Sequence, residues 1–197
     1  NDKWHFPLGK NPNYGLEISS SIIFSDSIPL FAFIFKIFKN FLSENFQYFS
    51  LWVFFCFFLQ FYFSYSIIYK ITNNSYYSLV SGIFFIISPI FIYRLGYHMS
   101  LAGQWLILIG FYINFFINGS REKKIWIFLL ILSTLIHLYF TAMLFIMYAS
   151  FTFESFLRDK KIKDFIRNLF FPLIIVLIFM YIFGYFESKP INSVSRG

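Results

Sequence analysis

Long apolar segments almost without charge are the feature that most constrains the fold of this chain. Apart from Lys124 and Arg167 they carry no charged side chain, and they lie at residues 47–69, 76–93, 99–117, 124–153 and 165–186. About 20 helical residues cross the hydrocarbon core of a bilayer, whereas a transmembrane β-strand needs roughly half that number and alternates in hydrophobicity. Backbone groups in lipid must be hydrogen-bonded within the spanning structure. The segments therefore predict an all-α polytopic integral membrane protein.

The composition excludes an ordinary soluble domain. Hydrophobic residues make up 58% of the chain and charged residues only 13%, far from the balance of a soluble protein. The net charge of +7 requires no nucleic acid, because short loops rich in Lys and Arg stay cytoplasmic and meet anionic lipid. The single Cys56 cannot form an intrachain disulfide. We thus expect the lipid bilayer, and no nucleic acid, as a partner.

The segment 124–153 allows two interpretations. It is too long for one upright helix and too short for two full spans, so it forms either one tilted helix or a hairpin that turns near His137. A hairpin places nine of the sixteen basic residues on one side of the membrane: Lys70, Arg121, Lys123, Lys124, Arg158, Lys160, Lys161, Lys163 and Arg167. If the segment is a single helix, the most basic loop, at residues 158–167, lies on the opposite face of the membrane. The rule that positive loops stay inside therefore favours the hairpin.

The hairpin interpretation predicts six membrane helices, at 47–69, 76–94, 99–117, 124–136, 138–155 and 166–186. An outer-face region at 1–46 precedes them, and a polar tail at 187–197 follows. Pro89 lacks a backbone N–H and is expected to kink the second helix. The outer face then receives the N-terminal region, the turn 94–98, the tip at His137 and the tail.

The first 46 residues differ in character from the rest. Prolines and glycines between Pro7 and Gly15 mark turns, and an apolar stretch at 28–42 follows, in which polar residues recur at helical spacing. This pattern predicts an amphipathic helix that lies in the membrane interface. Pro29 suits the first turn of that helix, and Asp26 or Ser27 suits its N-cap.

Four short motifs resemble those of an uncharacterised family of bacterial polytopic membrane proteins, a domain of unknown function. They read WHFPLGKNPNYG at 4–15, FSDSIPL at 24–30, RLGYHMSLAGQW at 94–105 and IHLYF at 136–140. That family is thought to share the fold of GT-C glycosyltransferases, which use polyprenyl-phosphate-linked sugars at the outer face of the membrane. Residues 1–186 resemble the GT-C module without its first helix.

This resemblance implies an activity and a location. We expect a GT-C-like membrane glycosyltransferase, or a fragment of one, that moves a sugar from a polyprenyl-phosphate donor. It implies the bacterial inner (cytoplasmic) membrane, with the N-terminal loop on the outer face. The alternative is a non-enzymatic membrane protein, such as a glycan-export component or a scaffold.

Two acidic residues are candidates for catalysis. Glycosyl transfer needs a group that deprotonates the acceptor, usually a carboxylate or an imidazole. Asp26 lies beside the predicted interfacial helix, where a lipid-linked donor would arrive, and its alternative role is the helix cap. Glu17 follows the turn-rich segment and suits a metal or acceptor site, with a solvated loop acid as its alternative.

Four other side chains complete the predicted site. His98 and His137 are catalytic candidates because burying ionisable groups in a membrane is costly, although a neutral imidazole bonded to a neighbouring helix satisfies the same physics. Arg94 is a candidate ligand for a lipid phosphate, unless it only extends to the headgroups. Gln104 is a second substrate-binding candidate, while it and Gln60 more often hydrogen-bond between helices.

A divalent metal ion is a conjecture. Two histidines and two acids are suitable ligands in type, yet their spacing matches no recognised ligand motif. The sequence leaves the metal, the sugar and the acceptor open.

Overall fold

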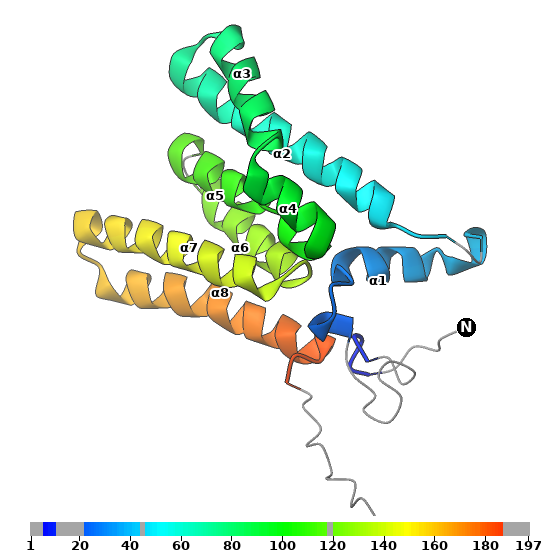
Figure 1. Cartoon of the computed structure of the whole chain (residues 1–197). Helices are drawn as coiled ribbons and strands as arrows, with labels where there is room; N and C mark the ends of the chain where they lie inside the picture. Colours follow the sequence, from blue (N-terminus) through cyan, green and yellow to red (C-terminus); the bar gives the residue numbers. More distant parts are fainter. Residues whose placement is uncertain (1–5, 11–21, 44–45, 118–119, 187–197) are drawn as a thin grey trace, which may run out of the picture.

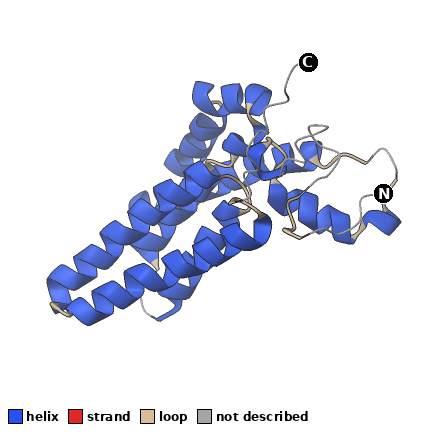
Figure 2. Cartoon of the chain, turned by 90° about the horizontal axis from the view of Figure 1, so that it is seen from below, coloured by secondary structure: helices blue, strands red, loops and turns tan. Residues whose placement is uncertain are grey.

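The described part of the chain, residues 6–10, 22–43, 46–117 and 120–186 of this computed structural model, is built from helices (Figures 1 and 2). No β-strand is assigned within these ranges. The α-helices are α1 (Pro29–Ile37), α2 (Phe49–Thr72), α3 (Ser75–Ile86), α4 (Pro89–Tyr97), α5 (Trp105–Phe116), α6 (Ser120–Thr134), α7 (Leu138–Asp159) and α8 (Ile162–Phe183). Short 3-10 helices are η1 (Ile22–Phe24), η2 (Lys39–Phe41) and η3 (Met99–Ala102).

Within the described residues, five helical segments are long and apolar enough to cross a membrane, one fewer than the six predicted. They are Phe49–Thr72, Ser75–Tyr97, Met99–Phe116, Leu138–Asp159 and Ile162–Phe183. The difference is α6, which covers residues 124–134 of the predicted helix 124–136. It has only 15 residues, or about 22 Å at 1.5 Å per residue, against a hydrocarbon core of about 30 Å.

Two of the five crossing segments are interrupted. Pro89 breaks its segment between α3 and α4, where a kink was predicted, because Ser88 before it takes an extended backbone with ψ of 129° and Pro89 offers no N–H to continue the ladder. Gly103 and Gln104 separate η3 from α5. Both interruptions bring polar residues into the bundle.

The segment 124–153 is divided between α6 and α7, and its linker is 135–137. The His137 backbone is extended, and the Tyr139 N–H donates to its ring Nδ1 at 3.2 Å. His137 therefore caps α7, which gives the new helix a partner for one of its free N–H groups.

One end of the bundle gathers segments that are far apart in sequence. There the Leu30 N–H donates to the Leu135 carbonyl at 2.7 Å, and the Tyr185 hydroxyl donates to the Thr134 carbonyl at 2.5 Å. We call this the Asp26 end. The turns between α2 and α3 and between α7 and α8 lie at the opposite end (Figure 1), which we call the Lys161 end.

The predicted helix 28–42 is shorter in the structure, since α1 ends at Ile37 and only the one-turn η2 follows. The N-cap predicted for Asp26 or Ser27 is wrong. Ile28 is the N-cap residue, with a positive φ of 49° and no side-chain cap. The Ser27 hydroxyl donates instead to the Ile22 carbonyl at 2.7 Å, and a carbonyl of the α6–α7 linker accepts the Leu30 N–H, so α1 needs no side-chain cap there.

Gly110 lets α5 pack closely against α7. A Cβ atom at this position would lie 2.9 Å from Leu144 Cδ2 and 3.0 Å from Met147 Cε. We expect Gly110→Leu to lower the free energy of unfolding by about 1–3 kcal/mol, the usual cost of overpacking. At Gly96 a Cβ atom meets nothing within 4 Å, so Gly96→Leu is the matched control. Thermal unfolding in detergent measures both, and equal stability of the two variants would contradict the prediction.

Candidate functional site

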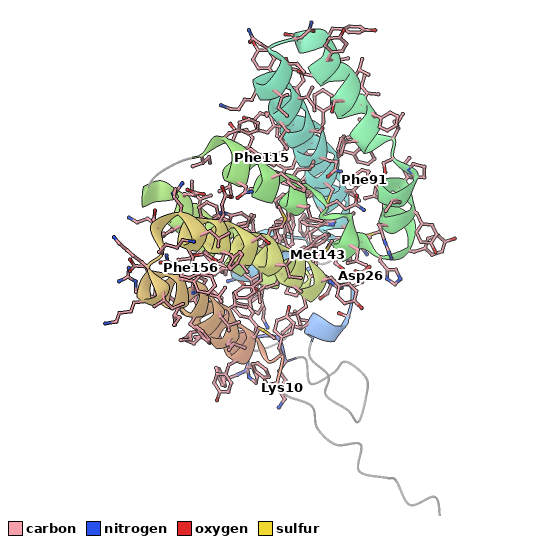
Figure 3. The ribbon with its side chains drawn as sticks, turned by 90° about the vertical axis from the view of Figure 1, so that its left-hand side faces the viewer. Lys10, Asp26, Phe91, Phe115, Met143 and Phe156 are labelled. Atoms are coloured by element: carbon pink, nitrogen blue, oxygen red, sulfur yellow. The ribbon has the colours of Figure 1, made fainter. Side chains whose placement is uncertain are left out.

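Asp26 lies between η1 and α1 and is held by a residue 74 positions away. Its Oδ1 accepts from the backbone N–H of Ser100 at 2.9 Å and also from the Ser100 hydroxyl. Ser100 is only 2% exposed. Two donors on one oxygen fix the direction of the carboxylate. Figure 3 shows Asp26 at the end of the bundle opposite Phe156.

Two further contacts fix the backbone around this pair. The Trp52 indole N–H donates to the Met99 carbonyl at 2.7 Å, next to Ser100. The Tyr48 hydroxyl donates to the Ser27 carbonyl at 2.5 Å, next to Asp26. Trp52 is completely buried. The start of α2 thus positions both the carboxylate and the residue that binds it.

His98 and His137 lie near Asp26. Burial lowers the pKa of His137, the Asp26 carboxylate offsets part of this change, and the His98 imidazole lowers it further. His98 is exposed in the turn after α4, and His137 is half-buried. The predicted residues Asp26, His98 and His137 therefore come together at one end of the bundle.

The cap made by His137 decides what its ring can do. Because Nδ1 accepts the Tyr139 N–H, the neutral ring carries its proton on Nε2. In this state His137 is a hydrogen-bond donor toward a ligand. Protonation of Nδ1 would remove the acceptor that caps α7.

We expect this cap to make stability depend on pH. Since the folded pKa of His137 is lowered, the unfolded chain binds more protons as pH falls below about 6.5, the ordinary imidazole value. The stability contributed by the neutral ring is complete above that pH and is lost on acidification. His137→Asn retains an N-cap acceptor without the titration. Melting temperatures between pH 5 and 8 should show wild type losing stability toward acid relative to this variant, and the reverse trend would contradict the assignment.

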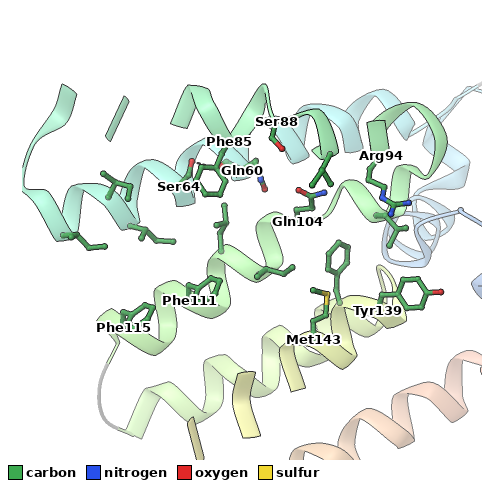
Figure 4. Close-up of a pocket in the computed structure, with 18 residues that line it drawn as sticks. Gln60, Ser64, Phe85, Ser88, Arg94, Gln104, Phe111, Phe115, Tyr139 and Met143 are labelled. Atoms are coloured by element: carbon green, nitrogen blue, oxygen red, sulfur yellow. Dashed lines mark hydrogen bonds between the residues drawn. The ribbon is translucent and has the colours of Figure 1, made fainter. Parts of the chain in front are cut away.

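Arg94 and Gln104 line a cavity of about 600 Å³, which we call the groove. Arg94 is in the last turn of α4 and Gln104 immediately precedes α5. The other walls come from α2, α3 and α7, and they are largely aliphatic and aromatic. Figure 4 shows Arg94 and Tyr139 toward one end of this groove and Phe111 and Phe115 toward the other. Among the described residues that line the groove, only Arg94 carries a charge.

The groove and the carboxylate are neighbours in the fold. Arg94 and Leu101 both line the groove, and Leu101 follows Ser100, the residue that binds Asp26. Tyr139 lines it from α7 and follows His137 by two residues. A charged and hydrogen-bonding cluster thus lies next to the cationic end of an apolar groove. Such an arrangement suits an amphiphile with an anionic headgroup.

Two predictions lack support from the described residues. Glu17 lies outside them. Within them, no group of three or more His, Cys, Asp or Glu side chains could hold a metal ion. The metal conjecture therefore gains no ligand set here.

Three residues of the site were not predicted from the sequence to belong to it: Ser100, Trp52 and Gln60. Ser100 and its neighbours belong to one of the four motifs, but its contact with Asp26 spans the chain. Gln60 was interpreted mainly as a helix-packing residue, yet it lines the groove. Its place in the same cavity as Arg94 depends on how α2 packs and has no local signal.

Comparisons with curated proteins and with solved structures found no significant match. A family model described as a domain of unknown function, DUF6311, matches residues 1–197. The chain therefore belongs to the DUF6311 family.

Proposed function

We propose that this protein is a membrane glycosyltransferase that moves a sugar from a polyprenyl-phosphate donor to an acceptor at the outer face of the bacterial inner membrane. The observation that carries the proposal is Asp26, held by Ser100 beside the Arg94 end of an apolar groove. The basic side chains at the Lys161 end support an orientation with the Asp26 end outside.

The roles of the residues follow from the chemistry of transfer. Asp26 takes the proton of the acceptor hydroxyl while the oxygen of that hydroxyl attacks C1 of the sugar. The bond between C1 and the phosphate oxygen breaks, and the polyprenyl phosphate leaves. Arg94 binds this phosphate and stabilises the charge that develops on it. His137, with its proton on Nε2, donates a hydrogen bond to the same headgroup region.

The test is made in cells, because the acceptor is then supplied. The full gene, as wild type or with Asp26→Asn, is returned to a host strain from which it was deleted, and surface glycans are analysed by mass spectrometry. A transferase should restore the glycan only with Asp26 intact. Full restoration by an equally expressed Asp26→Asn protein would favour the non-enzymatic role, as an export component or scaffold.

A further inference from the structure

Gln60 is a buried amide that lacks a partner for one of its polar atoms. It lies in the middle of α2 and is 2% exposed, and its Oε1 accepts no hydrogen bond from the part of the chain that the structure describes. An unpaired buried polar group is costly, and in an apolar membrane helix Leu would fit without that penalty. The amide oxygen therefore calls for a partner that the described residues do not supply.

The amide belongs to a polar stretch of the groove. Gln60, Ser88 and Gln104 line the same cavity from three different parts of the chain. Figure 4 shows these three residues between Phe111 and Arg94. We call these three residues the amide stretch. The aromatic rings of Phe85 and Phe140 line the same cavity.

The chemistry of the amide stretch selects a class of ligand. An amide offers both a donor and an acceptor, and a hydroxyl group is the neutral partner that can satisfy both. A hydrocarbon chain can satisfy neither, and an ion would be expected to meet charged side chains, of which the cavity has only Arg94. A sugar ring combines hydroxyl groups with apolar faces that pack on aromatic rings.

We propose that the amide stretch binds the sugar of the lipid-linked donor, with Gln60 as a sugar-specificity residue. This inference rests on the proposed function. Arg94 then holds the phosphate that joins the sugar to its lipid. The lipid chain extends out of the groove past Ile90 and Tyr139, which line the groove and are both 67% exposed.

Binding of two kinds of lipid, with and without a sugar, tests the inference. The purified full chain in nanodiscs is titrated with undecaprenyl phosphate and with undecaprenyl phosphates that carry glucose, mannose or N-acetylglucosamine, by native mass spectrometry. Wild type should bind at least one sugar-bearing lipid more tightly than the bare phosphate. Gln60→Leu should lose about 3- to 10-fold in affinity for that lipid, the range of one or two neutral hydrogen bonds, and keep its affinity for undecaprenyl phosphate.

Matched variants separate this role from a structural one. Asn114 in α5 also has a buried, unpaired amide oxygen, but it does not line the groove, so Asn114→Leu should change neither affinity. Gln60→Asn keeps the amide and withdraws it by one methylene, so it should give an intermediate loss. It also provides the test if Gln60→Leu does not fold.

Three results would overturn the inference: no preference for any sugar-bearing lipid, an equal loss for both kinds of lipid in Gln60→Leu, or no loss for either. The last is expected if water alone satisfies the amide. Failure of the proposed function looks different, because sugar-selective binding would then persist while Asp26→Asn restored the surface glycan.

Discussion

Asp26→Asn should lower glycosyl transfer by at least about 100-fold, the lower range for loss of a general base. The substitution removes the charge that accepts the proton and keeps an oxygen that can accept from the Ser100 N–H, now 2.9 Å from the carboxylate. The local fold should therefore survive. Loss of the surface glycan in complemented cells, with unchanged amounts of protein in the membrane, is the measurement.

Two variants control for charge and for position. Asp159→Asn removes a carboxylate at the Lys161 end, where Asp159 is bound only weakly by the exposed Arg158 at 3.4 Å, and it should leave transfer unchanged. Ser100→Ala removes one of the two donors to Asp26 and should weaken transfer less than Asp26→Asn does. If Asp159→Asn and Asp26→Asn had equal effects, Asp26 would have no special role.

Trp52→Ala should cause the largest loss of stability among single substitutions near the site, about 3–5 kcal/mol, as for other buried tryptophans. Trp52 is fully buried, its ring lies edge-on to Phe31 with centroids 5.3 Å apart, and its N–H binds the Met99 carbonyl. The substitution leaves a cavity between α1 and α2 and frees the backbone that presents Ser100. Thermal unfolding in detergent measures the loss.

Trp52→Phe separates packing from the hydrogen bond. It keeps most of the aromatic volume and removes the N–H donor. We expect the free energy of unfolding to fall by about 1–3 kcal/mol because the Met99 carbonyl loses its partner, and to fall further because the ring is smaller. A variant as unstable as Trp52→Ala would show that the hydrogen bond dominates. A fully stable Trp52→Ala would contradict the role of Trp52 at the centre of the site.

The candidate site was predictable in part because its residues lie at the ends of apolar segments. Arg94, His98 and His137 each follow or interrupt such a segment, and ionisable groups in these places are functional candidates because burying them in a membrane is costly. Their approach to Asp26 could be anticipated only by assuming a hairpin in 124–153. In the structure that segment is divided between α6 and α7, and His137 lies in the linker.

Other features had no local signal. Asp26 precedes Pro29 in a pattern typical of a helix N-cap, and local chemistry favoured that role. In the structure the carboxylate binds Ser100 of η3, and a carbonyl of the α6–α7 linker accepts the Leu30 N–H. Likewise, the sequence shows Gln60 only as an isolated amide in an apolar segment, and the packing of α2 places it in the groove.

The amino-acid pattern alone predicts the class of protein, because apolar segments of this length are stable only as membrane helices that satisfy their own backbone. It also indicates two interruptions, at Pro89 and near His137, although not the residues at which the helices begin and end. Which polar groups meet depends on tertiary packing. Hydrogen bonds such as the one between Ser100 and Asp26 join residues 74 positions apart, and their partners are chosen by helix packing, which no local pattern encodes.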